Sequence, residues 1–524
     1  MSQGSDPAVA RQSVLRGAAA AAGTGLVLPA LSGAAPAQRL SGRPAARWGA
    51  QVGDVTGSSG VVWVRSDRPA RMVVETSASD SFRNVRRHIG PVLGAGSDFT
   101  GTTSLHGLPA GEQVHYRVLL TDPEDPRRAG EPVRGTFRTA PADRRTDVRF
   151  LWSGDIAGQG WGINPDRGGY PIFDEMGRRD PDFFLCSGDN IYADSPIEER
   201  VTLPDGRIWR NVTTEEKSKV AETLAEFRGN FRYNLLAENL RGFNARTPNI
   251  VQWDDHEVLN NWYPGEILDD DRYTEKRVDV LAANARRAFG EYFPLSTPRP
   301  DRGGRIYRVV RHGPLLDVFV LDMRTYRNAN SPGLQTADEQ GILGAEQLGW
   351  LKRELSRSRA LWKVIASDMP LGLVVPDGDD AEAVAQGDPG APLGRELQIA
   401  DLLRHIKHGR ITGTLWLTTD VHYTSAQHYD PARAAFKDFA PFWEFVSGPL
   451  NAGGFPALKL DGTFGPAQPF VKSPAHANTS PMDGGQYYGE VEIDGHSGEL
   501  TVRLLEEGGQ VLFTKVLQPG LVGQ

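Results

Sequence analysis

The feature that most constrains this 524-residue chain is a series of six short apolar runs that each lead into aspartate. Runs of this kind are typical of strands that are buried on both faces. Amphipathic stretches lie between several of them and predict helices at 214–240, 278–292, 345–356 and 393–408. The alternation predicts an α/β domain built of layered sheets and helices. The apolar runs cover 148–153, 182–187, 249–253, 315–321, 361–367 and 413–419, and the aspartates are Asp155, Asp189, Asp254 with Asp255, Asp322, Asp368 and Asp420.

In an open α/β sheet, ligands bind at the edge where the carboxyl ends of the strands meet. A single aspartate after a strand is most often a turn former or a helix cap. Six at one edge would repel one another, and cations are the natural way to keep such a cluster ionised. The one cysteine, Cys186, lies in an apolar run and excludes both a disulfide framework and a cysteine-rich zinc site. Any metal ligands must therefore be oxygen and imidazole groups.

A different pattern precedes this region. Short strand-like runs at 61–64, 72–75 and 115–120 predict a small all-β sandwich over 45–140. Tyr116 and the residues shortly before it resemble the tyrosine-corner region of fibronectin type III domains. This part has no cluster of acids or histidines, so we interpret it as a packing module and place the chemistry at 146–518. Further runs at 443–447, 487–493, 499–504 and 511–516 predict additional strands and a second sheet.

The first 37 residues are typical of an export signal peptide. Arg11 and Arg16 precede a small apolar run at 17–31, and Ala-Pro-Ala at 35–37 fits a cleavage site. The segment resembles a twin-arginine box in which Gln12 replaces the second arginine. The apolar run is too short to span a bilayer. We expect a secreted or extracytoplasmic protein with no transmembrane anchor; a disordered N-terminal tail is the alternative.

Two classes of function are disfavoured by composition and motifs. The net charge of −8 argues against broad electrostatic binding to nucleic acid, which needs clustered lysine and arginine. The chain has no G-x-S-x-G segment, which argues against a serine hydrolase. These exclusions direct attention to metal-dependent chemistry at the aspartates.

Four segments lie around those aspartates: residues 152–164, S-G-D-N-I-Y-A-D at 187–194, W-D-D-H-E at 253–257 and T-D-V-H-Y at 419–423. Taken in this order, they resemble the alkaline phosphatase D family, a branch of the calcineurin-like metallophosphoesterases. The resemblance covers about 148–516, and the residues at 152–164 are also similar to secreted, metal-dependent phospholipase D members of that family. It implies a two-sheet αββα sandwich with an N-terminal fibronectin III-like domain, within the α/β class.

The resemblance also implies two adjacent metal ions. Many relatives have cysteine where this chain has Asp155, whereas purple acid phosphatases have aspartate. Phenolate and imidazole ligands suit ferric iron, and oxygen-rich ligand sets suit calcium or manganese. We therefore expect Fe³⁺ and Ca²⁺, with Mn²⁺ or Zn²⁺ as alternatives. The implied ligands are Asp155, Tyr192 and His422 at the first site, Asp189 as the bridge, and Asp255, Asp368 and Asp420 at the second site.

Several further side chains are candidates for roles around the metals. His256 would lie beside the phosphate and stabilise charge or protonate the leaving oxygen. Arg324 would clamp the phosphate with two hydrogen bonds, or would form a structural ion pair with a neighbouring acid. The remaining candidates are Asn190 as a polar catalytic contact, and Asp194, Asp254 and Asn260 as residues that orient the ligands.

Three functions stay open at this point, and so does the oligomeric state. The favoured one is a secreted hydrolase of phosphate mono- and diesters, in which a hydroxide held by two metals attacks phosphorus in line. The second is a phospholipase D, for which Trp161, Trp262 and Tyr263 are candidates for lipid contact, although they are as easily core or rim residues. The third is a non-catalytic extracellular binding protein. The intact acids argue against it, because a retired site has no need of mutually repelling carboxylates.

The export signal predicts the N-terminus of the mature protein. Cleavage after Ala37 leaves Gln38 as the first residue. Mass spectrometry of protein from the culture medium should give an N-terminus near Gln38. An intact Met1 on the exported protein would contradict the signal-peptide interpretation.

Overall fold

The computed structural model describes residues 42–143, 145–297, 304–337 and 341–520. Apart from Gly42, these residues belong to the compact unit Arg43–Gln524. The export signal predicted at 1–37 lies outside the described residues. Within the described ranges, no helix combines the length and the apolar character needed to cross a membrane.

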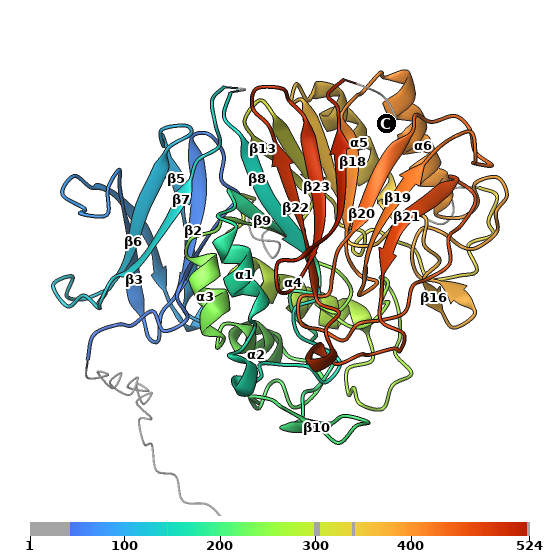
Figure 1. Cartoon of the computed structure of the whole chain (residues 1–524). Coiled ribbons are helices and arrows are strands. Elements are labelled where there is room, and N and C mark those ends of the chain that lie inside the picture. Colours follow the sequence, from blue (N-terminus) through green and yellow to red (C-terminus); the bar gives the residue numbers. More distant parts are fainter. Residues whose placement is uncertain (1–41, 144, 298–303, 338–340, 521–524) are drawn as a thin grey trace, which may run out of the picture. The chain divides into compact units, whose positions relative to one another are not determined.

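Two large sheets form the centre of this unit (Figure 1). The first has nine strands, in the order β24 (Val511–Leu517), β23 (Leu500–Glu506), β22 (Tyr487–Ile493), β8 (Val148–Ser153), β9 (Phe183–Ser187), β12 (Asn249–Gln252), β1 (Ala50–Gly53), β2 (Ser59–Arg65) and β5 (Thr100–His106). The second has seven, in the order β13 (Arg308–His312), β14 (Leu316–Val320), β15 (Trp362–Ala366), β18 (Thr414–Thr418), β20 (Phe442–Val446), β19 (Thr424–Tyr429) and β21 (Pro466–Lys472).

All six apolar runs form strands. The first and last residue of each strand lie within one residue of the predicted ends of the run. They form two parallel triplets, β8, β9 and β12 in the first sheet and β14, β15 and β18 in the second. In a parallel triplet the carboxyl ends lie at one edge, so three of the predicted aspartate positions follow strand ends at one edge of each sheet.

Side chains along these strands alternate between two cores, as the two-residue period of a strand requires. Val318 and Val364 pack in a core shared with the first sheet, whereas Phe319 and Ile365 pack against α5 (Gly344–Arg357) and α6 (Glu396–His408). The outer face of the first sheet is covered by α1 (Ile172–Arg178), α2 (Leu224–Asn234), α3 (Glu238–Asn244) and α4 (Val278–Tyr292) (Figure 1). The order of layers confirms the predicted αββα sandwich.

The helix predicted over 214–240 is instead two shorter helices. The side chain of Thr223 accepts a hydrogen bond from the backbone N–H of Glu226, and the Glu226 side chain bonds back to the Thr223 backbone. This capping box sets the first turn of α2 at Leu224, so residues 214–223 precede the helix as turns and irregular backbone. The chain leaves helical geometry at Leu235, and α3 begins three residues later.

The N-terminal part is all β, as predicted. Its strands β1, β2 and β5 pack against a four-stranded sheet of β4 (Arg86–Leu93), β3 (Ala70–Ser77), β6 (Gln113–Thr121) and β7 (Val133–Arg138). The nine-stranded sheet runs on into this part, because β1 pairs in parallel with β12 at Gly53 and Asn249. A Cβ at Gly53 would lie 2.6 Å from the Asn249 carbonyl oxygen, so this approach requires glycine. The two predicted domains share one sheet, and their boundaries at 45–140 and 146–518 stay a prediction.

A buried ion pair joins the end of β1 to the second sheet. Arg308 donates from Nε and Nη2 to the two carboxylate oxygens of Asp54, both at 2.8 Å, and from Nη1 to the Val251 carbonyl at 3.0 Å. The Asp54 carboxylate also accepts from the backbone and hydroxyl of Ser296. Both charged side chains are at most 4% exposed. Removal of one partner would leave a buried charge without compensation.

The Arg308→Met variant tests whether this ion pair stabilises the junction. We expect it to lower the free energy of unfolding by about 3–5 kcal/mol, since Asp54 keeps its charge in a buried position. The matched control is Arg311→Met on the same strand, where the arginine is half exposed beside Asp317 and a change below about 1 kcal/mol is expected. Equal denaturant midpoints for the two variants would contradict this account.

Candidate metal centre

The carboxylates of the centre sit where strands end and the chain turns sharply. Asp155, Asp189 and Asp420 follow β8, β9 and β18 within two residues, and their φ angles are 59°, 49° and 72°. His422 also has a positive φ, of 57°. Left-handed backbone is uncommon for residues other than glycine and concentrates at functional sites. These turns direct side chains from several strands into one place.

Acid and histidine side chains form three groups here. Within each group, the potential ligand atoms all lie within 4.8 Å of one another. They share Asp189 and Asp255, so they form one continuous cluster of buried or half-buried groups. Of the predicted ligands, Asp155, Asp189, Asp255, Asp420 and His422 are brought together directly. The groups are Asp155 with Asp189 and His422, Asp189 with Asp255 and His256, and Asp254 with Asp255 and Asp420.

Many oxygens of this cluster have no protein donor. Among the described residues, both carboxylate oxygens of Asp155 and Oδ2 of Asp254, Asp368 and Asp420 are buried without a hydrogen-bond partner. Burial of an unpaired carboxylate raises the free energy of the fold by at least about 2 kcal/mol unless a cation or a proton compensates the charge. The donor set is hard and anionic, and therefore fits multivalent cations.

The pKa values show the same need for positive charge. Burial, and after it the neighbouring carboxylates, raise the pKa of Asp155, Asp189, Asp368 and Asp420 well above the ordinary range. Asp255 differs, because His256 and Arg324 outweigh its burial and lower its pKa. Without cations, these four carboxyl groups would therefore bind protons more readily than ordinary aspartates do.

Tyr192 and His422 form the imidazole and phenol side of the cluster. The Tyr192 hydroxyl lies 2.8 Å from His422 Nε2, and His422 Nδ1 donates to the Gly453 carbonyl. Burial lowers the pKa of His422 to about 4, so the ring is neutral. With Nδ1 donating, Nε2 carries the lone pair and faces Tyr192, which is the tautomer that a metal ligand needs.

His256 carries the positive charge of the cluster. Its Nδ1 lies 2.8 Å from Asp194 Oδ1, and the ring packs against Tyr192 at a tilt of 30° with centroids 4.3 Å apart. Burial by itself would lower the pKa of His256, but Asp194 and Asp255 raise it to about 9. Asn260 donates its backbone N–H to the same Asp194, while its side chain is exposed.

Arg324 lies beneath the carboxylates and is fully buried. Its Nε donates to Asp254 Oδ1 at 2.7 Å, and its Nη1 donates to Glu382. Of the two roles considered for it, this geometry matches the ion pair with neighbouring acids. Asn190 is also buried, and its amide donates to the Gln252 carbonyl and to Glu257.

Two buried glutamates were not among the predicted site residues. Glu257 accepts from the backbone N–H groups of Asn190 and Asp254, and burial raises its pKa to about 7. Its place directly after W-D-D-H was the signal that could have identified it. Glu382 pairs with Arg324 but lies in an irregular segment, directly after a two-residue strand, where no periodicity marks it.

The aromatic residues considered for lipid contact are mostly internal. Trp161 is 5% exposed and Trp262 is 2% exposed, whereas Tyr263 is half-buried. Trp161 Nε1 donates to Asn478, and Trp262 packs edge-on against Trp253. The two tryptophans are therefore core residues. Cys186 is a buried residue of β9, as its apolar run predicts.

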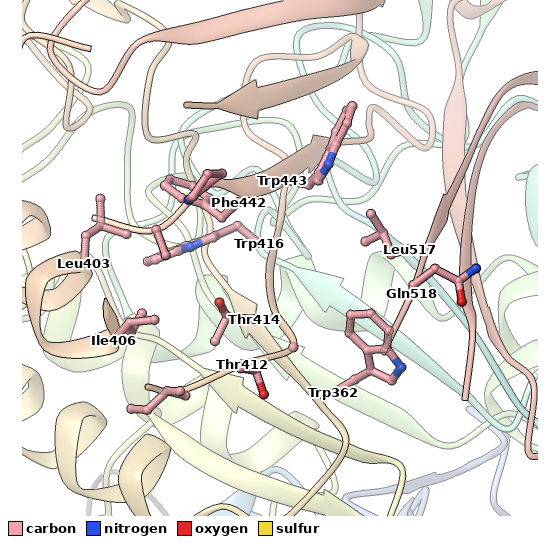
Figure 2. Close-up of a pocket in the computed structure, with 14 residues that line it drawn as sticks. Trp362, Leu403, Ile406, Thr412, Thr414, Trp416, Phe442, Trp443, Leu517 and Gln518 are labelled. Atoms are coloured by element: carbon pink, nitrogen blue, oxygen red, sulfur yellow. The ribbon is translucent and has the colours of Figure 1, made fainter. Parts of the chain in front are cut away.

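A separate pocket lies at the amino ends of strands in the seven-stranded sheet (Figure 2). Its lining includes Trp362, Thr414 and Phe442, which are the first residues of β15, β18 and β20. Asp368 and Asp420 follow the last residues of β15 and β18. The pocket and the carboxylate cluster therefore lie at opposite ends of the same strands.

A two-sheet αββα sandwich with acids and histidines gathered at its strand ends defines a metallophosphoesterase-type protein. The sequence profile of the PhoD-like phosphatases matches residues 150–504, and the profile of their N-terminal domain matches residues 33–141. The chain belongs to the PhoD-like phosphatase family.

Similar proteins agree with this assignment. The alkaline phosphatase D of Bacillus subtilis (strain 168) is 30% identical over 305 residues, which cover 55% of this chain and 49% of the relative. The match thus spans about half the length of that relative. A solved structure of PhoD aligns with a TM-score of 0.67 at 21% identity, covering 92% of this chain and 90% of that one. The purple acid phosphatase PPD1 from yellow lupin seeds aligns with a TM-score of 0.55 at 12% identity, covering 91% and 74%. Both structures support the fold.

The Asp194→Asn variant tests the control of His256. In the metal-free protein we expect the pKa of His256 to fall from about 9 by at least about one unit, because the closest anion is lost and burial favours the neutral ring. A pKa above the ordinary 6.5 also means that protonation stabilises the fold below pH 6.5 and that this stabilisation is lost as the pH rises through 9.

NMR titration of the imidazole gives the measurement. Asp438→Asn, which removes a carboxylate beside the exposed His408, is the matched control and should leave the His256 titration unchanged. If Asp194→Asn left the titration of His256 where it is in the wild type, the assigned pairing would be wrong.

Proposed function

We propose that this protein is a metal-dependent hydrolase of phosphoric esters that acts on mono- and diesters. The observation that carries the proposal is the convergence of buried carboxylates, several of whose oxygens find no donor among the described residues. Membership of the PhoD-like phosphatase family supports it, as does the similarity to a protein named alkaline phosphatase D.

We assign two cations to the cluster. Asp155, Tyr192 and His422 suit ferric iron, because a phenol and a neutral imidazole join the carboxylate there. Asp255, Asp368 and Asp420 offer oxygen alone and suit calcium, and Asp189 lies between the two sets. Mn²⁺ or Zn²⁺ are the alternative ions. When bound, such a pair supplies Lewis acidity that activates water and neutralises phosphoryl oxygens.

We assign to His256 the protonation of the leaving oxygen. Asp194 holds its Nδ1, which leaves Nε2 as the atom that donates the proton. In the metal-free cluster, a pKa of about 9 keeps this ring protonated at neutral pH. Asp194 thus fixes both the orientation and the charge of His256.

The inner polar residues hold the cluster in place. Arg324 and Asp254 form an ion pair below the ligands, and Asn190 fixes the turn after β9 against Glu257. We assign Asn190, Asp254 and Asn260 to this supporting function. The phosphate would then be neutralised by the cations and by His256 rather than by Arg324.

Two alternatives are separated by direct tests. A phospholipase D would use the same centre to release a head group, but two of its three candidate lipid contacts, Trp161 and Trp262, are buried. A non-catalytic binding protein would have no reason to bury carboxylates that lack donors.

We place the activity outside the cytoplasm because the sequence of residues 1–37 is typical of an export signal.

Turnover on three substrates distinguishes these functions. p-Nitrophenyl phosphate, bis(p-nitrophenyl) phosphate and phosphatidylcholine vesicles should be compared before chelation, after chelation and after add-back of single metals. The proposal expects turnover of the first two that chelation abolishes and add-back restores. Turnover of phosphatidylcholine alone would favour the phospholipase, and no metal and no turnover would favour the binding protein.

The Asp189→Ala variant tests the shared ligand. Because Asp189 belongs to two of the three ligand groups, its loss should remove bound metal and lower turnover by at least about 100-fold. Asp182→Ala, next to the other end of β9, is the matched control and should keep its metal. Near-normal turnover in Asp189→Ala would show that the two-metal assignment is wrong.

A further inference from the structure

Three buried arginines lie behind the carboxylate cluster, and they meet at one glutamate. Arg324, Arg327 and Arg395 are at most 3% exposed, and Glu382 is fully buried. The Glu382 carboxylate accepts from Arg324 Nη1 and, at 2.9 Å, from Arg327 Nη1. The function proposed above gives this glutamate no role.

The position of Glu382 is fixed by its backbone rather than by a regular element. It follows the two-residue strand β17 (Asp380–Ala381), in the segment between β15 and α6. Arg395 donates to the carbonyl groups of residues 381–383, and Arg327 Nη2 donates to the Glu382 carbonyl. Arg395 also donates to residues 328–330. The segment is thus held against the loop that follows Arg324 and Arg327.

Arg324 lies near the ligands of the proposed second metal site but does not form hydrogen bonds with them. Its Nη2 lies 3.7 Å from Asp420 Oδ1 and 3.9 Å from Asp255 Oδ1, and its Nε lies 3.8 Å from Asp368 Oδ2. These distances allow electrostatic attraction but exceed those of hydrogen bonds. In keeping with this, Oδ2 of Asp368 and of Asp420 have no hydrogen-bond partner among the described residues.

We propose that Glu382 is a positioning residue that holds Arg324 at this distance and so keeps the oxygens of Asp255, Asp368 and Asp420 available to a cation. A guanidinium seeks acceptors for all its donors. Glu382 accepts from Nη1 and Asp254 accepts from Nε, and Nη2 lies 2.6 Å from Asp254 Oδ1 without making a hydrogen bond among the described residues. The two acids hold the guanidinium from two sides, which keeps Arg324 from closing on the ligands. The inference rests on the two-cation centre proposed above.

The Glu382→Gln variant tests this in the full-length protein. Isothermal titration of chelator-treated protein with Mn²⁺ should show two sites in the wild type. In Glu382→Gln we expect one site of unchanged affinity and one weakened by about 10–100-fold, because Arg324 then competes for the second-site oxygens. The matched control is Glu396→Gln, a buried glutamate 14 positions along the chain that accepts from Gln386 and Leu393; both its affinities should stay as in the wild type.

The outcomes separate this inference from the proposed function. Two wild-type affinities in Glu382→Gln would overturn the inference, and so would an equal loss at both sites, which a merely structural role would cause. A wild type that binds no pair of cations would overturn the two-cation centre as well. If Glu382→Gln does not fold, Glu382→Asp decides: its shorter carboxylate should weaken one site several-fold, and unchanged affinities would overturn the proposal.

Discussion

Carboxylates that are buried together repel one another and lose their hydration, and this protein gathers them at the carboxyl ends of strands from both central sheets. Burial and mutual repulsion raise the pKa of Asp155, Asp189, Asp368 and Asp420. The fold compensates in part from within, through the guanidinium of Arg324 and the imidazolium of His256. Several oxygens remain without a donor among the described residues, and they define the place for external positive charge.

The architecture explains how so many acids can be held so close. Two parallel triplets, one in each sheet, end at edges from which short left-handed turns direct the side chains into one cluster. The sheet that carries β8, β9 and β12 continues into the N-terminal part through β1, and the Arg308–Asp54 pair ties that junction to the second sheet. The N-terminal part therefore supports the strands that position the centre.

Much of this could be predicted from sequence, because apolar runs buried on both faces and the aspartates behind them are local signals. The predicted bounds of β15 and β18 were within one residue. Asp155, Asp189, Asp255, Asp420 and His422, which the family resemblance implied as ligands, do meet. The break between α2 and α3 was missed, because the amphipathic pattern runs through a capping box that sets a new start.

Contacts between distant segments left no local signal. The burial of Arg324 depends on Asp254 and Glu382, which are 70 and 58 residues away along the chain. The sequence therefore left open whether Arg324 clamps the phosphate or forms a structural ion pair. Glu382 lies in an irregular segment without periodicity. The burial of Trp161 and Trp262 likewise follows from tertiary packing that composition does not reveal.

X-ray diffraction from crystals of full-length protein, purified without chelator and measured on both sides of the iron absorption edge, tests the central claim most directly. The account predicts two ions that share Asp189 as a ligand, the first with Asp155, Tyr192 and His422 and the second with Asp255, Asp368 and Asp420. A cluster that holds no ion, or ions bound away from Asp189, would contradict it.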